Sequence, residues 1–116
     1  MGAEEERWAP HLPLKPYVAA IMGELASGPL HGYALMTRLE GFKGGRGIGP
    51  ATLYRTLDRL VTEGWIRPVQ GAAPSARRGS TYALTSSGRG LLTAEVARLE
   101  GWARTAKAAL GASVAE

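Results

Sequence analysis

The sequence predicts a mostly α-helical fold with a small β-hairpin and a long C-terminal helix. Three observations support this prediction: three segments have apolar residues at helical spacing, two β-like runs flank an irregular basic segment, and the last segment has a heptad pattern. With 116 residues and 45% hydrophobic content, the chain is expected to form a single globular domain with a small core.

The N-terminal segment has no helical pattern, unlike the residues after it. Residues 1–14 contain two prolines and show no clear period, so we expect a flexible arm with a short turn around Trp8. A first helix is expected over about residues 16–27, because Pro16 suits the first helical position and apolar residues come after it at helical spacing.

A second helix is expected over about residues 31–41. Its buried face is expected to hold Leu35, Leu39 and either Tyr33 or Ala34. The next segment, GFKGGRGIG at residues 41–49, has five glycines and is expected to be a loop. It lacks the G-K-[ST] and G-x-G-x-x-G patterns of nucleotide-binding loops.

A third helix is expected over residues 50–63, with Pro50 at its first position and Gly64 just past its end. One face carries an apolar stripe, formed by Leu53, Leu57, Leu60 and Val61. The other face is polar or small, and holds Ala51, Thr52, Arg55, Asp58, Arg59 and Thr62.

Two paired strands are expected after this helix, at Trp65–Gln70 and Ser80–Leu84. Pro68 cannot donate a backbone hydrogen bond, which places the first strand at a sheet edge. The segment between them, GAAPSARRG, is too long for a tight turn and is expected to project from the sheet.

A final helix is expected from residue 86 to about residue 110, with the Thr85 hydroxyl capping the N–H of Gly88. Its apolar residues alternate four and three apart over nearly three heptads: Leu92, Val96, Leu99, Ala103, Ala106 and Leu110. A helix of about 37 Å outreaches so small a core, so we expect a second copy of the chain to cover this stripe as a dimerisation surface.

Positive charge is concentrated in the middle of the chain. Residues 38–78 hold eight basic and three acidic groups, whereas the chain as a whole has a net charge of +4. The excess therefore lies on the third helix and the hairpin, as expected of a nucleic-acid-binding surface. An ordinary solvated basic surface is the alternative interpretation.

The composition argues against several functional classes. The chain has no cysteine and only two histidines, His11 and His31, with no Ser–His–acid set, so we expect no catalytic residues, no metal site and no cofactor. We expect His31 to be a helix-start residue. No apolar run approaches 20 residues and the acidic N-terminus lacks a signal-peptide core, so a cytoplasmic location without a membrane is expected.

Six short segments also carry a family resemblance: GPLHGY at 28–33, TLY at 52–54, EGWI at 63–66, RR at 77–78, YALT at 82–85 and SG at 87–88. In this order and spacing the chain resembles the compact branch of the PadR family of winged helix-turn-helix transcription regulators. Gly49 and Ser86 stand where the family usually has Ser and Glu. The resemblance implies an arm at 1–14, a winged helix-turn-helix DNA-binding domain at 15–85, and a C-terminal dimerisation helix and tail at 86–116.

DNA contact is expected to centre on the third helix, because a recognition helix places its N-terminal turns near the bases. Arg55 can make the bidentate contact to guanine, and Arg77 and Arg78 can contact phosphates or the minor groove. The expected DNA-binding residues are Tyr33, Arg38, Ala51, Thr52, Tyr54, Arg55, Arg59, Arg77 and Arg78. Structural roles remain open as alternatives for Tyr33, Arg38, Thr52 and Tyr54.

The expected function is that of a homodimeric repressor on a pseudo-palindromic operator in double-stranded DNA. The resemblance also implies a planar aromatic effector, bound in a slot between the two copies of Trp102 with Leu99 and Trp8 nearby. Packing of Trp102 on the first helix or on the partner's arm is the alternative. A winged-helix adaptor that binds protein is the competing function, but it would require an apolar patch on the third helix.

Overall fold

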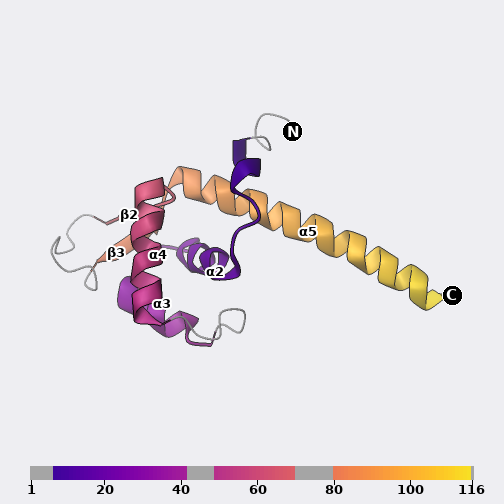
Figure 1. Ribbon diagram of the computed structural model, residues 1–116, viewed down its shortest axis with the longest axis horizontal. Coiled ribbons are helices and arrows are strands. Elements are labelled where there is room, and N and C mark those ends of the chain that lie inside the picture. The colour runs from indigo at the N-terminus through magenta and orange to yellow at the C-terminus, as the bar shows by residue number, and fades with distance from the viewer. Residues whose placement is uncertain (1–6, 42–48, 70–79, 116) are drawn as a thin grey trace.

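The computed structural model describes residues 7–41, 49–69 and 80–115. The elements in chain order are η1 (Ala9–His11), α2 (Pro16–Leu25), β1 (Leu30–His31), α3 (Gly32–Leu39), α4 (Pro50–Glu63), β2 (Ile66–Pro68), β3 (Thr81–Leu84) and α5 (Ser86–Ala115). Helices α2, α3 and α4 gather with the sheet at one end, and α5 extends far beyond them (Figure 1). The molecule therefore measures 61 × 34 × 21 Å.

The predicted helices are all present, with some differences in length. Helix α4 has the predicted bounds, because Pro50 begins it and Gly64 ends it in the left-handed conformation, with φ 85°. Helices α2 and α3 each end two residues before the predicted position, and α5 continues to Ala115 instead of stopping near residue 110. The Thr85 hydroxyl caps α5 as predicted, and accepts the Gly88 N–H at 2.9 Å.

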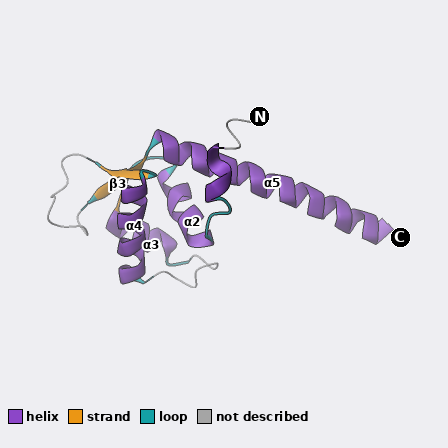
Figure 2. Ribbon diagram, turned by 45° about the horizontal axis from the view of Figure 1, so that its top comes forward, coloured by secondary structure: helices purple, strands orange, loops and turns teal. Residues whose placement is uncertain are grey.

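The predicted hairpin is the larger part of a three-stranded antiparallel sheet in the described residues, ordered β1-β3-β2. Strand β2 lies at the edge, as Pro68 predicts, and pairs Ile66 with Leu84. Strand β1 was not predicted. It pairs Leu30 with Tyr82 and His31 with Thr81 of β3, the strand labelled in Figure 2, and α3 begins at the residue after it.

The core lies where the sheet and the helices meet. The predicted apolar faces of the helices supply most of it, since the most deeply buried side chains are Ile21, Met22, Leu25, Leu35, Leu53, Leu57, Leu60, Ile66 and Leu91. Of the two candidates on α3, Tyr33 is 71% exposed and Ala34 is partly covered. The core is therefore built from α2, α3, α4, the sheet and the first turns of α5.

The described part of the N-terminal segment is packed on the core, which differs from the prediction of a flexible arm. Trp8 is only 6% exposed and lies against Gly90, where a β-carbon would collide with the indole ring. The indole of Trp8 also lies 6.1 Å from that of Trp65, measured between ring centroids. The absence of a side chain at Gly90 therefore leaves the space on α5 in which the N-terminal segment packs through Trp8.

Helix α5 leaves the core after its third turn. From Val96 to Ala112 none of its side chains is buried. None of the described helices, α5 included, has the apolar length that a membrane crossing requires. Within the described residues, the C-terminal half of α5 is thus an exposed helix that carries both charged and apolar side chains.

Candidate nucleic-acid interface

Helix α4 has two faces of opposite character, as its residue spacing predicts. Leu53, Leu57 and Leu60 are at most 2% exposed and face the core. Thr56 is also buried, and its hydroxyl donates to the Thr52 carbonyl at 2.8 Å, which satisfies its polar group inside the helix. The opposite face is exposed along its length, at Ala51, Thr52, Arg55, Arg59 and Thr62. The structure thus presents five of the six predicted polar-face residues outward.

The N-terminus of α4 is open. Gly49 is extended at the N-cap and supplies no side-chain cap, and Pro50 has no N–H. The amide groups of the first turn therefore have no side-chain partner at the cap position. Anions are stabilised near such a terminus by the free N–H groups and the helix dipole.

Tyr54 connects α4 to α3. A β-carbon at Gly32 would lie 3.0 Å from Cε1 of the Tyr54 ring, so the ring packs directly on the first residue of α3. Tyr54 is half-buried as a result. The structural alternative for Tyr54 is thus present in the fold, and the exposed part of the ring is what remains available for another contact.

Helix α3 holds two further predicted contact residues in different environments. Tyr33 is exposed, and its N–H is capped by Nδ1 of His31 at 3.0 Å, which confirms His31 as a helix-start residue. Arg38 forms an ion pair with Glu24 on α2, with Nη1 and Oε1 3.2 Å apart and the arginine side chain 52% exposed. An exposed pair of this kind contributes about 0–1 kcal/mol, so Arg38 can leave it at little cost.

The hairpin places one more cation beside α4. Arg67 on the edge strand β2 is exposed, whereas its neighbour Ile66 is 1% exposed. The alternation of strand residues could have identified Arg67, which the sequence prediction counted only in the charge balance. Arg77 and Arg78 lie outside the described residues, so their contact role stays a prediction.

A second polar cluster lies on α5, away from α4. Glu95 is 2% exposed, and its carboxylate accepts bonds from Arg98 Nε at 2.7 Å, Arg98 Nη2 at 3.0 Å and the Leu14 N–H at 3.2 Å. The hydrogen bond from Arg98 lowers the pKa of Glu95 below its usual range, against the opposing effect of burial. Sequence reasoning missed this residue. It fastens the N-terminal segment to α5.

The predicted dimerisation stripe is exposed on the free part of α5. Val96 and Leu99 are each 45% exposed, and Leu110 is 66% exposed. Ala103 and Ala106 lie half-covered between them, and Leu92 packs against the core cluster. The structure therefore separates Leu92 from the rest of the stripe, which continues along the uncovered rod.

The predicted ligand slot is not assembled within one chain. Trp8 is buried against Gly90, whereas Trp102 is 68% exposed and lies twelve positions further along α5. Twelve residues span about 18 Å of helix, too far for contact between the two rings. Trp102 does not pack on α2 either, so the surface beside Leu99 is open to a partner.

Among the described residues, no group of three acidic or histidine side chains could hold a metal ion.

Comparisons with known proteins agree with this arrangement. A family model described as the transcriptional regulator PadR-like family matches residues 21–94. The structure of Bacillus subtilis PadR in complex with operator DNA is similar with a TM-score of 0.57 and 27% identity, over 70% of this chain and 45% of that chain. A PadR-like transcriptional regulator from Bacillus cereus has a TM-score of 0.64 and 20% identity, over 79% of this chain and 88% of that one.

A curated relative comes from a mobile element. It is an uncharacterized 37.1 kDa protein in transposon TN4556 of Streptomyces fradiae, 39% identical over 84 residues. The match covers 70% of this chain but only 23% of the relative. This chain therefore corresponds to less than a quarter of that protein.

Proposed function

Because the chain belongs to the PadR-like family of transcriptional regulators, we propose that it binds double-stranded DNA sequence-specifically as a homodimer. The observation that carries this proposal is the two-faced helix α4, whose buried leucines hold it while Thr52, Arg55 and Arg59 face solvent. A helix held in this way can enter the major groove with its polar face toward the base edges. The relative solved on operator DNA shares 27% identity with this chain, which supports the same use of the fold.

The contacts of α4 divide by chemistry. Arg55 reaches out from the second turn and suits the bidentate contact to guanine O6 and N7. Ala51 and Thr52 at the start of the helix suit apolar contact with a thymine methyl group or a bond to phosphate. Arg59, one turn beyond Arg55, suits a phosphate at the edge of the groove.

The surrounding residues would position the helix on the backbone. Tyr33 and the exposed part of Tyr54 lie on α3 and α4, and Arg38 could exchange its exposed ion pair for a phosphate. Arg77 and Arg78, with the exposed Arg67 on β2, would contact the backbone or the minor groove from the wing. These contacts add affinity and orientation rather than sequence discrimination.

A dimer is supported by the uncovered part of α5. Its apolar residues Val96, Leu99 and Leu110 remain exposed along a helix of 30 residues, about 45 Å long. A second copy of α5 would cover this stripe in the manner of a coiled coil. The two copies of α4 would then read half-sites about 34 Å apart, one turn of the duplex.

Repression and release by a ligand extend this proposal. A dimer that occupies two successive major grooves blocks other proteins from the same site, which favours repression. Trp102 is exposed beside Leu99, so the indoles of two chains could line a flat slot near the two-fold axis. A planar aromatic molecule stacks favourably between such rings, and this makes it the proposed effector class.

Selection of bound duplexes from a random pool tests the proposal with the purified chain. We expect an enriched inverted repeat whose half-sites are centred about one helical turn apart. Enrichment of a single half-site would contradict the dimer, and absence of any enriched sequence would contradict sequence-specific DNA binding.

A further inference from the structure

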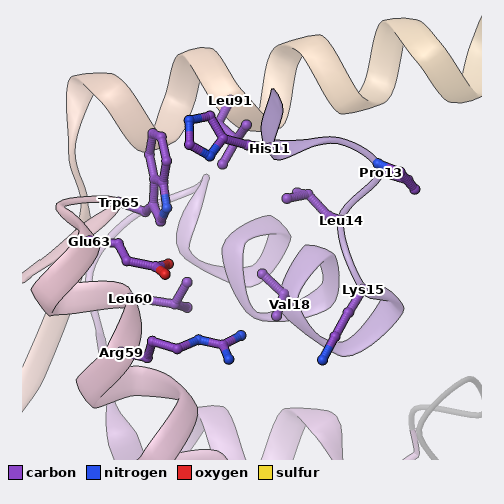
Figure 3. A pocket seen from close by; sticks show the side chains of 10 residues that line it. All are labelled: His11, Pro13, Leu14, Lys15, Val18, Arg59, Leu60, Glu63, Trp65 and Leu91. Carbon is purple, nitrogen blue, oxygen red and sulfur yellow. The ribbon is translucent and has the colours of Figure 1, made fainter. Parts of the chain in front are cut away.

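A cavity of about 200 Å³, open to solvent on one side, is lined by the N-terminal segment, α2, the recognition helix α4 and the first turns of α5 (Figure 3). Its inner wall is apolar, formed by Leu14, Val18, Leu60 and Leu91. Trp65 closes one end, with the His11 ring packed against it at 5.0 Å between centroids. The cavity is smaller than the roughly 300–1,000 Å³ of sites for drug-sized ligands, so a ligand of only a few carbons fits it.

Two cations from different elements converge on this cavity. Lys15 precedes α2 and Arg59 lies on α4, and Figure 3 shows their charged ends directed toward one another. In the described part of the chain neither side chain has an ion-pair partner. Glu63 also lines the cavity, one helical turn from Arg59, without an ion pair to it. Two like charges that converge repel each other, and an anion bound between them replaces that repulsion by attraction to both.

We propose that this cavity binds a small organic carboxylate with a short apolar body. The carboxylate lies between Lys15 and Arg59, where it neutralises the two facing cations. The apolar body lies against Val18 and Leu60, where its removal from water adds to the affinity. Glu63 opposes binding by its charge, so it limits how tightly any monoanion is held and disfavours dianions.

The site has a consequence for DNA binding that rests on the proposed function. Arg59 is a proposed phosphate contact on the exposed face of α4, and the same guanidinium would hold the carboxylate. A bound carboxylate therefore withdraws Arg59 from the DNA backbone. Ligand and DNA compete for one side chain.

Binding of hexanoate can be measured without DNA by NMR, through the indole N–H signal of Trp65 in the purified chain. We expect a saturable shift with hexanoate at constant ionic strength, a weaker one with hexan-1-ol, and none with hexylamine. Lys15→Gln and Arg59→Gln should each lower the affinity for hexanoate by about 1.5- to 5-fold, the range for exposed ion pairs. Glu63→Gln should raise the affinity, because it removes a negative charge from the cavity. The matched control Lys107→Gln, on the free part of α5, should leave the affinity unchanged.

The proposal would be overturned by the absence of a saturable shift with hexanoate, or by equal affinity for hexanoate in the parent and in both Lys15→Gln and Arg59→Gln. Equal binding of hexan-1-ol and hexanoate would also overturn the assigned ligand class. If the chain bound hexanoate but no DNA, this site would stand while the proposed function failed. With DNA present, hexanoate should lower the affinity of the parent and leave that of Arg59→Gln unchanged.

Discussion

Replacement of Glu95 by glutamine tests how the N-terminal segment is held on α5. The carboxylate is 2% exposed and accepts two bonds from Arg98 and one from the Leu14 N–H. Glutamine has nearly the same shape, but its amide has only one acceptor oxygen and presents a donor to groups that are donors themselves. At least one buried bond is therefore lost, and the bond to Arg98 loses its charge.

The magnitude depends on the burial of each partner. A hydrogen bond to a charged group contributes about 1.5–3 kcal/mol, but Arg98 is 41% exposed and can return to water. We therefore expect Glu95→Gln to lower the free energy of unfolding by about 1–2 kcal/mol at pH 7. For a chain of this size that corresponds to a decrease in Tm of about 4–8 °C. Glu100→Gln, at an exposed position on the same helix, is the matched control.

The pH dependence gives this prediction its sign. The hydrogen bond from Arg98 lowers the pKa of Glu95 in the folded chain below the ordinary value of 4.5. Its contribution to stability is therefore complete above about pH 4.5 and is lost as the pH falls through the lowered pKa. Urea unfolding from pH 7 to pH 3, at one protein concentration, should show the gap between parent and variant closing in acid. A gap that persists unchanged at pH 3, or an equal loss in Glu100→Gln, would refute the reasoning.

Three further predictions concern the fold and the interface. Gly88→Ala should lower the free energy of unfolding in urea by about 1–3 kcal/mol, because the new β-carbon would collide with the Trp65 carbonyl. Gly101→Ala meets no neighbour within 4 Å and should raise the free energy of unfolding by about 0.5–1 kcal/mol, so similar effects in the two variants would be inconsistent with the packing. Arg55→Ala should reduce discrimination at one base pair by about 1–3 kcal/mol in competition with single-base variants of the selected duplex, and an unchanged preference would rule out that contact. Leu99→Glu should sediment as a monomer where the parent is a dimer, since it places a charge in the apolar stripe, and equal masses would argue against α5 as the interface.

Local signals explain why much of the fold could be predicted. The bounds of α4 depend on Pro50 and Gly64, whose backbone preferences follow from their residue types. The cap of α5 depends on Thr85, which is only three residues from its partner Gly88. The polar face of α4 follows from the helical period alone. For such features the residue type and its spacing are sufficient.

The features that could not be predicted depend on contacts between distant segments. Strand β1 has two residues and exists only because it pairs with β3, some fifty positions later. The burial of Trp8 requires the gap that Gly90 leaves on α5, and neither residue indicates the other in the sequence. The sequence alone would similarly indicate that Glu95 is a solvated charge on a helix, because its contact with the distant Leu14 N–H exists only in the folded chain. The cavity behind α4 arises from the same docking of the N-terminal segment.

The most direct test of the central claim is the affinity of the purified chain for a selected duplex and for a mixed-sequence duplex, measured by fluorescence anisotropy over a series of salt concentrations. If α4 and the wing bind DNA, the selected duplex should bind more tightly. Affinity for both duplexes should then fall with salt at a slope of about 0.9 per phosphate contact. Absent or salt-independent binding to both duplexes would contradict the account and favour a protein-binding role for the same helices.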